Sequence, residues 1–295
     1  MASVYSYRDS NIRKTYLIFT VFLVFIIGAG FVFSQIYGNS LILVGAVIYS
    51  VVASFIGYYW SDKIALATSG AKLVNKEDNP ELYRVVENLA ITAGLPTPKI
   101  YVVPDMSPNA FATGRDPEHA SIAVTAGLLK IMDKTELEGV IAHELSHVGN
   151  RDILVSSIIV VLVGIISLLA NIFMNSLFWG FDDERSGNAL ALVIAIAFAI
   201  ISPIIAALIQ LAVSRKRELL ADASGVLLTR YPEGLISALK KIEQNAVPMR
   251  RANTATAHLW LSDPYKNKKK ISWMEKLFMT HPPIEERVAA LRNME

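Results

Sequence analysis

The chain contains no cysteine in its 295 residues. This absence excludes disulfide scaffolds, zinc sites with cysteine ligands, iron–sulfur clusters and thiol catalysis. Charged residues are also scarce, at 18% against the usual quarter, whereas hydrophobic residues reach 53% and the mean hydropathy is +0.41. That balance argues against intrinsic disorder. The formal net charge of +2 gives no reason to expect a nucleic-acid partner.

The apolar residues are concentrated in four uncharged runs, each near the length of about 20 residues that crosses a bilayer. They cover residues 17–37, 41–60, 153–179 and 189–213. The first run is too long for the apolar region of a signal peptide, and the second follows almost at once, so we expect the first to be retained. The alternative, buried helices of a large soluble fold, suits four such runs poorly. The sequence therefore predicts four transmembrane helices in a multi-pass protein of the cell membrane.

Basic residues indicate how these helices are oriented, because Lys and Arg favour the cytoplasmic side. They precede the first and third runs and follow the second and fourth: Arg8, Arg13, Lys14, Lys63, Arg151, Arg215, Lys216 and Arg217. Both termini and both long polar segments, 61–152 and 214–295, should then be cytoplasmic. Together these segments hold about 170 residues, enough for one domain. We expect them to pack together beside the membrane, with 1–60 as an N-terminal membrane segment and 153–213 as a helical hairpin.

Local signals place several elements in the first polar segment. Asn79 should cap a helix with Pro80 at its first position. Alternating or β-branched residues predict strands over 99–103, 109–113 and 121–125. Thr135 should cap the next helix, with Glu138 completing a capping box.

That helix contains the sequence His143-Glu144-Leu145-Ser146-His147. Two histidines four residues apart lie on one helix face, where both imidazoles can reach a single tetrahedral ion. Glu144 is placed to take a proton from a water on that ion. The alternative is a solvated face with two incidental histidines, but the apolar flank of this helix indicates that it is half buried. The pattern predicts a catalytic zinc site.

A catalytic zinc needs a third protein ligand and an open position. Ile153 and Asn150 occupy the places where metzincins carry histidine and glycine, which excludes that class. The remaining candidate is Glu218, and Asp222 one turn later could accept an N–H from a ligand histidine. The spacing alone fits two interpretations of Glu218 equally well, a zinc ligand and a surface charge after a membrane helix. If runs 153–179 and 189–213 form a hairpin, however, both motifs return to the same membrane surface.

These motifs resemble the HtpX-type family of integral-membrane zinc metalloproteases, which is related to the CAAX prenyl protease family. The resemblance extends over nearly the whole chain and is carried by residues 109–114 (NAFATG), 143–147 (HELSH), 150–152 (NRD), 217–222 (RELLAD) and 280–283 (THPP). It implies a mainly α membrane protein with four transmembrane helices and an α+β zincin-type (gluzincin) metalloprotease domain with a small sheet. It also implies one Zn²⁺ per chain, with Glu218 as the third ligand and Asp222 as the partner of a ligand histidine.

The resemblance further implies roles in substrate binding and catalysis. The stretch Asn109, Ala110, Phe111 and Ala112 resembles an edge strand that pairs with the substrate backbone. His281 is the candidate donor to the oxyanion, and the alternative for it is a packing role before Pro282. Arg287 is expected to be a structural ion-pair partner. His119 and His258 lie in polar, turn-like surroundings and receive no role.

The sequence therefore predicts a zinc endopeptidase that hydrolyses membrane or membrane-associated misfolded proteins in membrane protein quality control. Its partners should be polypeptide substrates and the lipid bilayer. One alternative is a prenyl-CAAX processing protease, whose family usually has more spans and a longer chain. A more remote alternative is a membrane scaffold with a structural metal, which would close the fourth position with a side chain. Cleavage preference, regulators and oligomeric state have no signal in the sequence.

Overall fold

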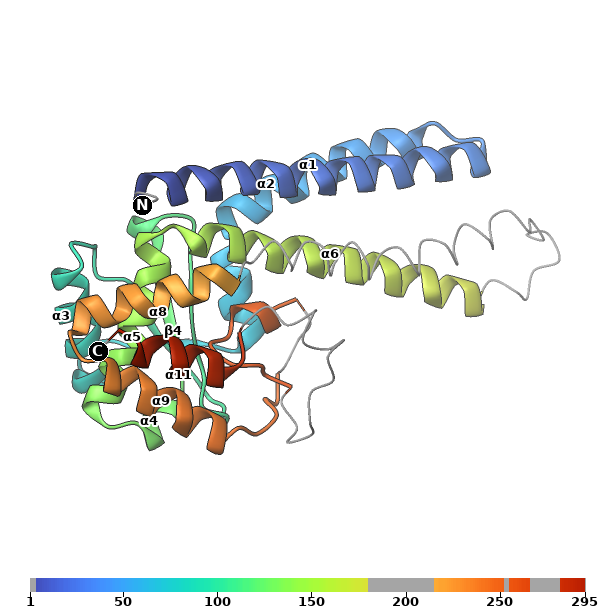
Figure 1. The fold of residues 1–295 in the computed structure, drawn as a ribbon. Coiled ribbons are helices and arrows are strands. Elements are labelled where there is room, and N and C mark those ends of the chain that lie inside the picture. Colours follow the sequence, from blue (N-terminus) through green and yellow to red (C-terminus); the bar gives the residue numbers. More distant parts are fainter. Residues whose placement is uncertain (1–3, 180–214, 252–254, 266–281, 295) are drawn as a thin grey trace.

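The computed structural model describes residues 4–179, 215–251, 255–265 and 282–294. Two long helices, α1 (Val4–Tyr37) and α2 (Leu41–Ser69), form an antiparallel pair that projects from a rounded body (Figure 1). Helix α6 (Asp152–Trp179) leaves the body in the same direction and packs on both. The chain is therefore divided into a bundle of long apolar helices and a body that holds the sheet.

Two helices in the described part of the chain are long and apolar enough to cross a membrane, within Asn11–Gln35 and Leu41–Ser69. Helix α5 and α6 as far as Leu168 meet the same criterion only as a pair bent by 84°. Residues 17–37, 41–60 and 153–179 are helical and lie within α1, α2 and α6. That all three cross a membrane stays a prediction. The fourth predicted span, 189–213, lies outside the described residues.

The second predicted helix ends later than expected. It does not stop at Trp60 but continues to Ser69, and Gly70 terminates it with a φ of 72°. Ala65 and Leu66 are buried, so the extra turns add apolar contacts with the body. No proline or glycine interrupts residues 61–69, so nothing in the sequence breaks the helix at the membrane boundary.

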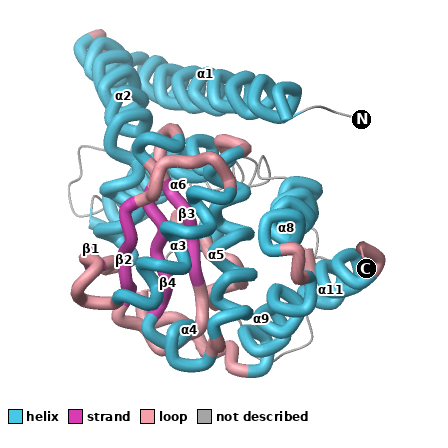
Figure 2. Tube along the Cα trace, turned by 90° about the vertical axis from the view of Figure 1, so that its left-hand side faces the viewer, coloured by secondary structure: helices cyan, strands magenta, loops and turns pink. Residues whose placement is uncertain are grey.

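The small sheet has the strand order β1 (Lys72–Leu73), β2 (Lys99–Val103), β4 (Ser121–Thr125) and β3 (Ala110–Thr113) (Figure 2). Strands β2 and β4 are parallel, whereas β3 is antiparallel to β4 with Ala110 opposite Val124. The strands predicted over 99–103 and 121–125 are confirmed, and the one predicted over 109–113 begins one residue later. Strand β3 lies at the edge of the sheet, where it packs on α5.

The helices of the body are α3 (Pro80–Thr92), α4 (Ala126–Ile131), α5 (Lys134–Gly149), α8 (Arg215–Thr229), α9 (Pro232–Gln244) and α11 (Ile284–Arg292). Helix α5 contacts α3, α8, α9 and β3. The predicted cap of α3 is confirmed, since the Asn79 side chain accepts the Leu82 N–H at 3.1 Å.

The predicted cap of α5 is wrong. The N-cap is Asp133 rather than Thr135, and the capping box joins Asp133 to Glu136 rather than to Glu138. The Asp133 carboxylate accepts the Glu136 N–H at 2.9 Å, and Glu136 accepts the Asp133 N–H at 2.9 Å. Aspartate caps a helix at least as well as threonine, and here the Thr135 hydroxyl donates to Asp133 instead. Helix α5 therefore starts at Lys134, one residue before Thr135, and the buried Glu136 completes its capping box.

One continuous apolar cluster joins the long helices to the body. Ile18, Phe22 and Ile158 belong to it, as do Phe111 of the edge strand and the fully buried Trp260. The rings of Phe111 and Trp260 meet edge to face at 4.7 Å between centroids. The cluster therefore packs α1, α2 and α6 against the edge of the sheet.

Candidate metal centre

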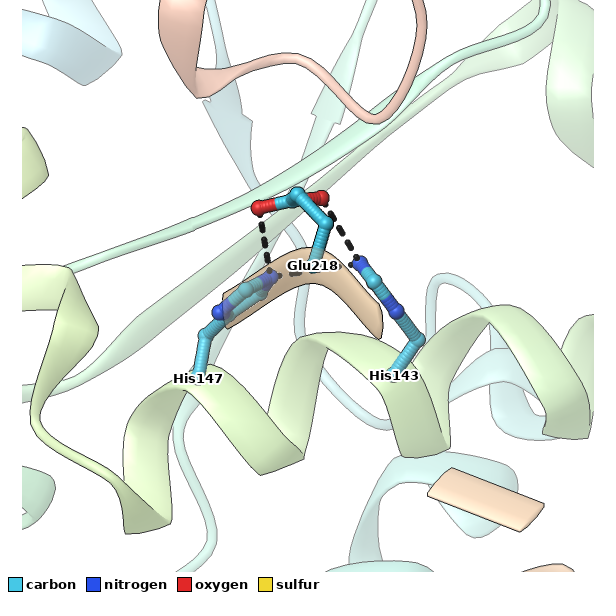
Figure 3. Close-up of side chains that lie close together, drawn as sticks. All are labelled: His143, His147 and Glu218. Carbon is cyan, nitrogen blue, oxygen red and sulfur yellow. Dashed lines mark hydrogen bonds and ion pairs between the residues drawn. The ribbon is translucent and has the colours of Figure 1, made fainter. Parts of the chain in front are cut away.

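His143 and His147 rise from neighbouring turns of α5, and Glu218 reaches over both from α8 (Figure 3). The two Nε2 atoms are 3.2 Å apart. Glu218 places one carboxylate oxygen 3.7 Å from Nε2 of His143 and the other 3.5 Å from Nε2 of His147. Ligands at 2.0–2.1 Å from a tetrahedral zinc are about 3.3–3.5 Å from one another. The three side chains therefore fit one such ion, which would keep a fourth position open.

The close approach of α8 to α5 depends on a glycine. Glu218, Asp222 and Gly225 follow one another at helical spacing on the face of α8 that meets α5. A Cβ on Gly225 would lie 3.0 Å from the backbone nitrogen of His143, which is closer than ordinary contact. The absence of a side chain at position 225 thus allows the two backbones to come near enough for Glu218 to face both imidazoles.

Each imidazole is oriented by a carboxylate on its other nitrogen. Asp222 lies 2.9 Å from Nδ1 of His143, and Asp152 lies 3.0 Å from Nδ1 of His147. A neutral imidazole that donates its Nδ1–H to a carboxylate keeps the Nε2 lone pair free for a metal. Sequence reasoning anticipated the place of Asp222 but not that of Asp152.

Each of these carboxylates is paired with an arginine. Arg287 of α11 donates to both oxygens of Asp222, at 2.6 and 2.8 Å. Arg217 donates to Asp152 at 3.1 Å. Burial raises the pKa of Asp222, but the guanidinium of Arg287 outweighs this and holds the pKa well below its usual range. The expectation that Arg287 is an ion-pair partner is confirmed.

Glu144 lines a cavity of about 20 Å³, which also touches both histidines and Glu218. That space holds about one water. Burial raises the pKa of Glu144 above its usual value, and the neighbouring imidazoles partly oppose the shift. Burial lowers the pKa of His147, but Glu218 and the hydrogen-bonded Asp152 outweigh it and raise that pKa to about 9. The arrangement thus places a weakly acidic carboxyl beside a water-sized space and the three candidate ligands.

The structure divides the four residues of the predicted substrate strand into two groups. The Asn109 side chain donates to the Ser262 carbonyl at 2.8 Å and accepts the Ser262 N–H at 3.0 Å. The carbonyl of Ala110 accepts the Leu261 N–H at 2.9 Å. Asn109 and Ala110 are therefore already engaged within the chain, and Phe111 packs on Trp260.

Ala112 differs from its neighbours because it lines the cavity. Backbone groups of a strand face alternate sides, so Ala112 directs its N–H and C=O to the same outer edge as Ala110. The part of the edge that lies beside the candidate ligands is therefore at Ala112.

His258 is a residue that sequence reasoning missed. It is buried, lines the same cavity, and its Nε2 donates to the Ser156 carbonyl at 2.8 Å. The apolar residues Leu259, Trp260 and Leu261 follow it directly and are the sequence signal that indicates a buried position. His281, the predicted oxyanion donor, lies outside the described residues.

Comparisons with known proteins identify the family of the chain. A model of a family described as peptidase family M48 matches residues 76–295. A protease HtpX homolog of Tropheryma whipplei (strain Twist) is 47% identical over 292 residues, which cover 99% of this chain and 98% of the relative. The homolog of the same name in Thermoanaerobacter pseudethanolicus is 44% identical over 300 residues, 99% of this chain and 98% of the relative.

A solved structure shares the fold. The crystal structure of S. mikatae Ste24p matches with a TM-score of 0.51 and 22% identity over 94% of this chain. The chain spans 65% of the length of that protein. The long apolar helices and these matches identify a membrane protein. The chain therefore belongs to peptidase family M48, as a metalloprotease of the HtpX type.

Proposed function

We propose that the protein is a zinc-dependent endopeptidase of the cell membrane, which hydrolyses membrane or membrane-associated misfolded polypeptides. One observation carries the proposal: His143, His147 and Glu218 present three ligand atoms within 4.8 Å of one another, and Glu144 lines the adjoining cavity. Two histidines and one glutamate form the ligand set of catalytic zinc sites that keep a position open for water. Zinc bound there would supply Lewis acidity toward the scissile carbonyl and the attacking water.

Residues of the chain itself carry out the remaining steps of binding and catalysis. Glu144 takes the proton of the attacking water and passes it to the leaving amine, and its raised pKa suits that exchange at neutral pH. The outer edge of β3 at Ala112 pairs with the substrate backbone, which gives affinity with little dependence on sequence. We propose His281 as the donor to the developing oxyanion. Asp222 holds the imidazole of His143 in its ligand orientation.

The proposed setting is a four-span protein with its termini and zincin-type domain in the cytoplasm. The basic residues at the ends of the runs support this orientation. The first turn of α1 and the whole of α11 lie at the body end of the long helices (Figure 1), as that orientation requires. Substrates would then meet the site at the cytoplasmic surface of the bilayer.

The test compares Glu144→Gln with the wild type, as full-length proteins in detergent. The variant should lose peptide hydrolysis and keep bound zinc, because Glu144 is a base and not a ligand. Glu138→Gln is the matched control, since Glu138 lies on the same helix and forms a partly exposed ion pair with Lys134 at 3.9 Å. Loss of zinc together with activity in Glu144→Gln, or retained activity, would overturn the assigned role.

The same inactive variant identifies the substrate class. Membrane fractions from cells that carry Glu144→Gln should retain uncleaved substrates on the protein. Enrichment of misfolded membrane proteins supports quality control. Enrichment of C-terminally prenylated proteins would instead favour the processing protease that the fold likeness to Ste24p allows.

A further inference from the structure

The two carboxylates behind the ligand histidines are held in different ways. Asp222 is held by Arg287, whereas Asp152 is held by Arg217 and also by a residue of the first long helix. That residue is Asn11, which is 3% exposed and lies at the start of the first candidate membrane span. A polar side chain at such a place is costly to bury unless its hydrogen bonds are satisfied.

The amide of Asn11 is fully used by groups around the candidate metal centre. Its Nδ2 donates to Oδ1 of Asp152 at 2.8 Å and to the carbonyl of Asn150 at 3.0 Å. Its Oδ1 accepts from Nη1 of Arg217 at 3.2 Å. Both donors and the acceptor of the amide therefore meet groups that lie more than a hundred residues away in the sequence.

These contacts hold the turn that directly follows His147. Helices α5 and α6 meet there at 84°, and Arg151 adopts a φ of 56°, which is uncommon for a residue other than glycine. Asn11 bonds the residue before Arg151 and the residue after it. It thereby fixes Asp152, whose second oxygen lies 3.0 Å from Nδ1 of His147.

We propose that Asn11 is a positioning residue of the metal site, which acts through Asp152 on the imidazole of His147. The inference rests on the proposed zinc-binding role of His147. It makes the first membrane helix a direct support of the active centre and more than a membrane anchor. Groups that orient a metal ligand typically change metal affinity or activity by about 10–100-fold when removed. Asn11 acts one contact further away, so we expect a loss of about tenfold.

The test measures the zinc dissociation constant by chelator competition, together with kcat/KM, on the full-length protein in detergent. Asn11→Leu keeps the size of the side chain and removes its hydrogen bonds, and both quantities should worsen about tenfold. Asn11→Ala is a second variant in case leucine prevents folding, and it should show the same loss. Thr15→Val is the matched control, because Thr15 is also buried one turn along and its hydroxyl donates to the backbone carbonyl of Asn11 and not to its amide.

A double-mutant cycle separates positioning from general packing. If Asn11 acts through Asp152, then Asn11→Leu should have little further effect on zinc affinity once Asp152→Asn is present. Additive losses, or wild-type zinc affinity in Asn11→Leu and Asn11→Ala, would refute the proposal. His147→Ala distinguishes this failure from failure of the proposed function. If zinc binding survives His147→Ala, the ligand set itself is wrong. If His147→Ala loses zinc but the Asn11 variants keep wild-type zinc affinity, the ligand set stands and only the role of Asn11 is rejected.

Discussion

The contact between α8 and α5 at Gly225 provides a test of how the ligands are brought together. An added Cβ would lie 3.0 Å from the backbone nitrogen of His143 and 3.2 Å from its Cα, and ordinary contact begins at 3.4 Å. In Gly225→Ala the two helices must therefore separate by about 0.4 Å near His143. Metal sites tolerate ligand displacements of about 0.2 Å. We expect the variant to bind zinc more weakly and to lose peptidase activity in parallel.

The free energy of unfolding should respond differently from zinc affinity. Overpacking costs about 1–3 kcal/mol, but replacing glycine by alanine within a helix returns about 1 kcal/mol. The metal-free variant should therefore lose about 0–2 kcal/mol and melt at most a few degrees below the wild type, whereas its zinc dissociation constant rises. Gly225→Val adds two further methyl groups at the same contact and should weaken zinc binding more than alanine does.

The assay is chelator competition on detergent-purified protein, with thermal melting of the metal-free form measured beside it. Gly45→Ala is the matched control, because Gly45 lies in α2 and no heavy atom would come within 4 Å of its Cβ. Wild-type zinc affinity in both Gly225 variants would refute the idea that this close backbone contact sets the position of Glu218.

Two further predictions concern the ligand set and the membrane topology. After dialysis against a mild chelator, Glu218→Ala should lose more bound zinc than Asp222→Asn, because the first change removes a ligand and the second only weakens the orientation of His143. Elemental analysis at equal protein measures the bound zinc, and the control Glu243→Ala should keep it. Full zinc occupancy in Glu218→Ala would remove Glu218 from the site. Reporter fusions at Glu295 and in the loop near Asp183 should give opposite signals, because we expect the termini in the cytoplasm and that loop outside. Matching signals would contradict the four-span topology.

The sequence predicts those parts of the fold and site whose causes are local. Strands 99–103 and 121–125 follow from their side-chain pattern, and the cap of α3 follows from Asn79 before Pro80. The placement of His143 and His147 on one face of α5 follows from helix periodicity alone. Glu218 required a topological argument, because the residues between it and His147 include two apolar runs.

Other parts of the site depend on contacts that leave no mark in the sequence. Asn11 and Asp152 are 141 residues apart, and neither belongs to a pattern that indicates the other. The pairing of Leu261 with Ala110 is a single backbone bond at the strand edge, so no alternation signals it. The cap of α5 was misassigned because Asp133 and Thr135 are both good caps two residues apart, and only the buried Glu136 decides between them.

The charges around the candidate metal centre lead to a final prediction. Among the described residues, four buried carboxylates meet there, and only two buried guanidinium groups accompany them: Glu144, Asp152, Glu218 and Asp222 with Arg217 and Arg287. Two negative charges remain among these buried side chains, and a dication would neutralise them. The half-buried ammonium of Lys14 lies further out and also interacts with Asp152. Without the ion, the carboxylates of Glu218 and Asp152 outweigh burial and raise the pKa of His147 to about 9, whereas the pKa of Glu144 is raised mainly by burial.

Zinc must therefore displace a proton from His147 at any pH below about 9. The sign follows from the raised pKa: the metal-free site holds this proton at neutral pH, so lowering the pH opposes zinc and raising it favours zinc. Between pH 7 and 9 the apparent zinc affinity should rise about tenfold per pH unit for the one proton released. Calorimetry in buffers of different ionisation enthalpy should detect the release of at least one proton at pH 7. Zinc binding without proton release there would show that His147 is already neutral and that the carboxylates of Glu218 and Asp152 do not act on it as their distances imply.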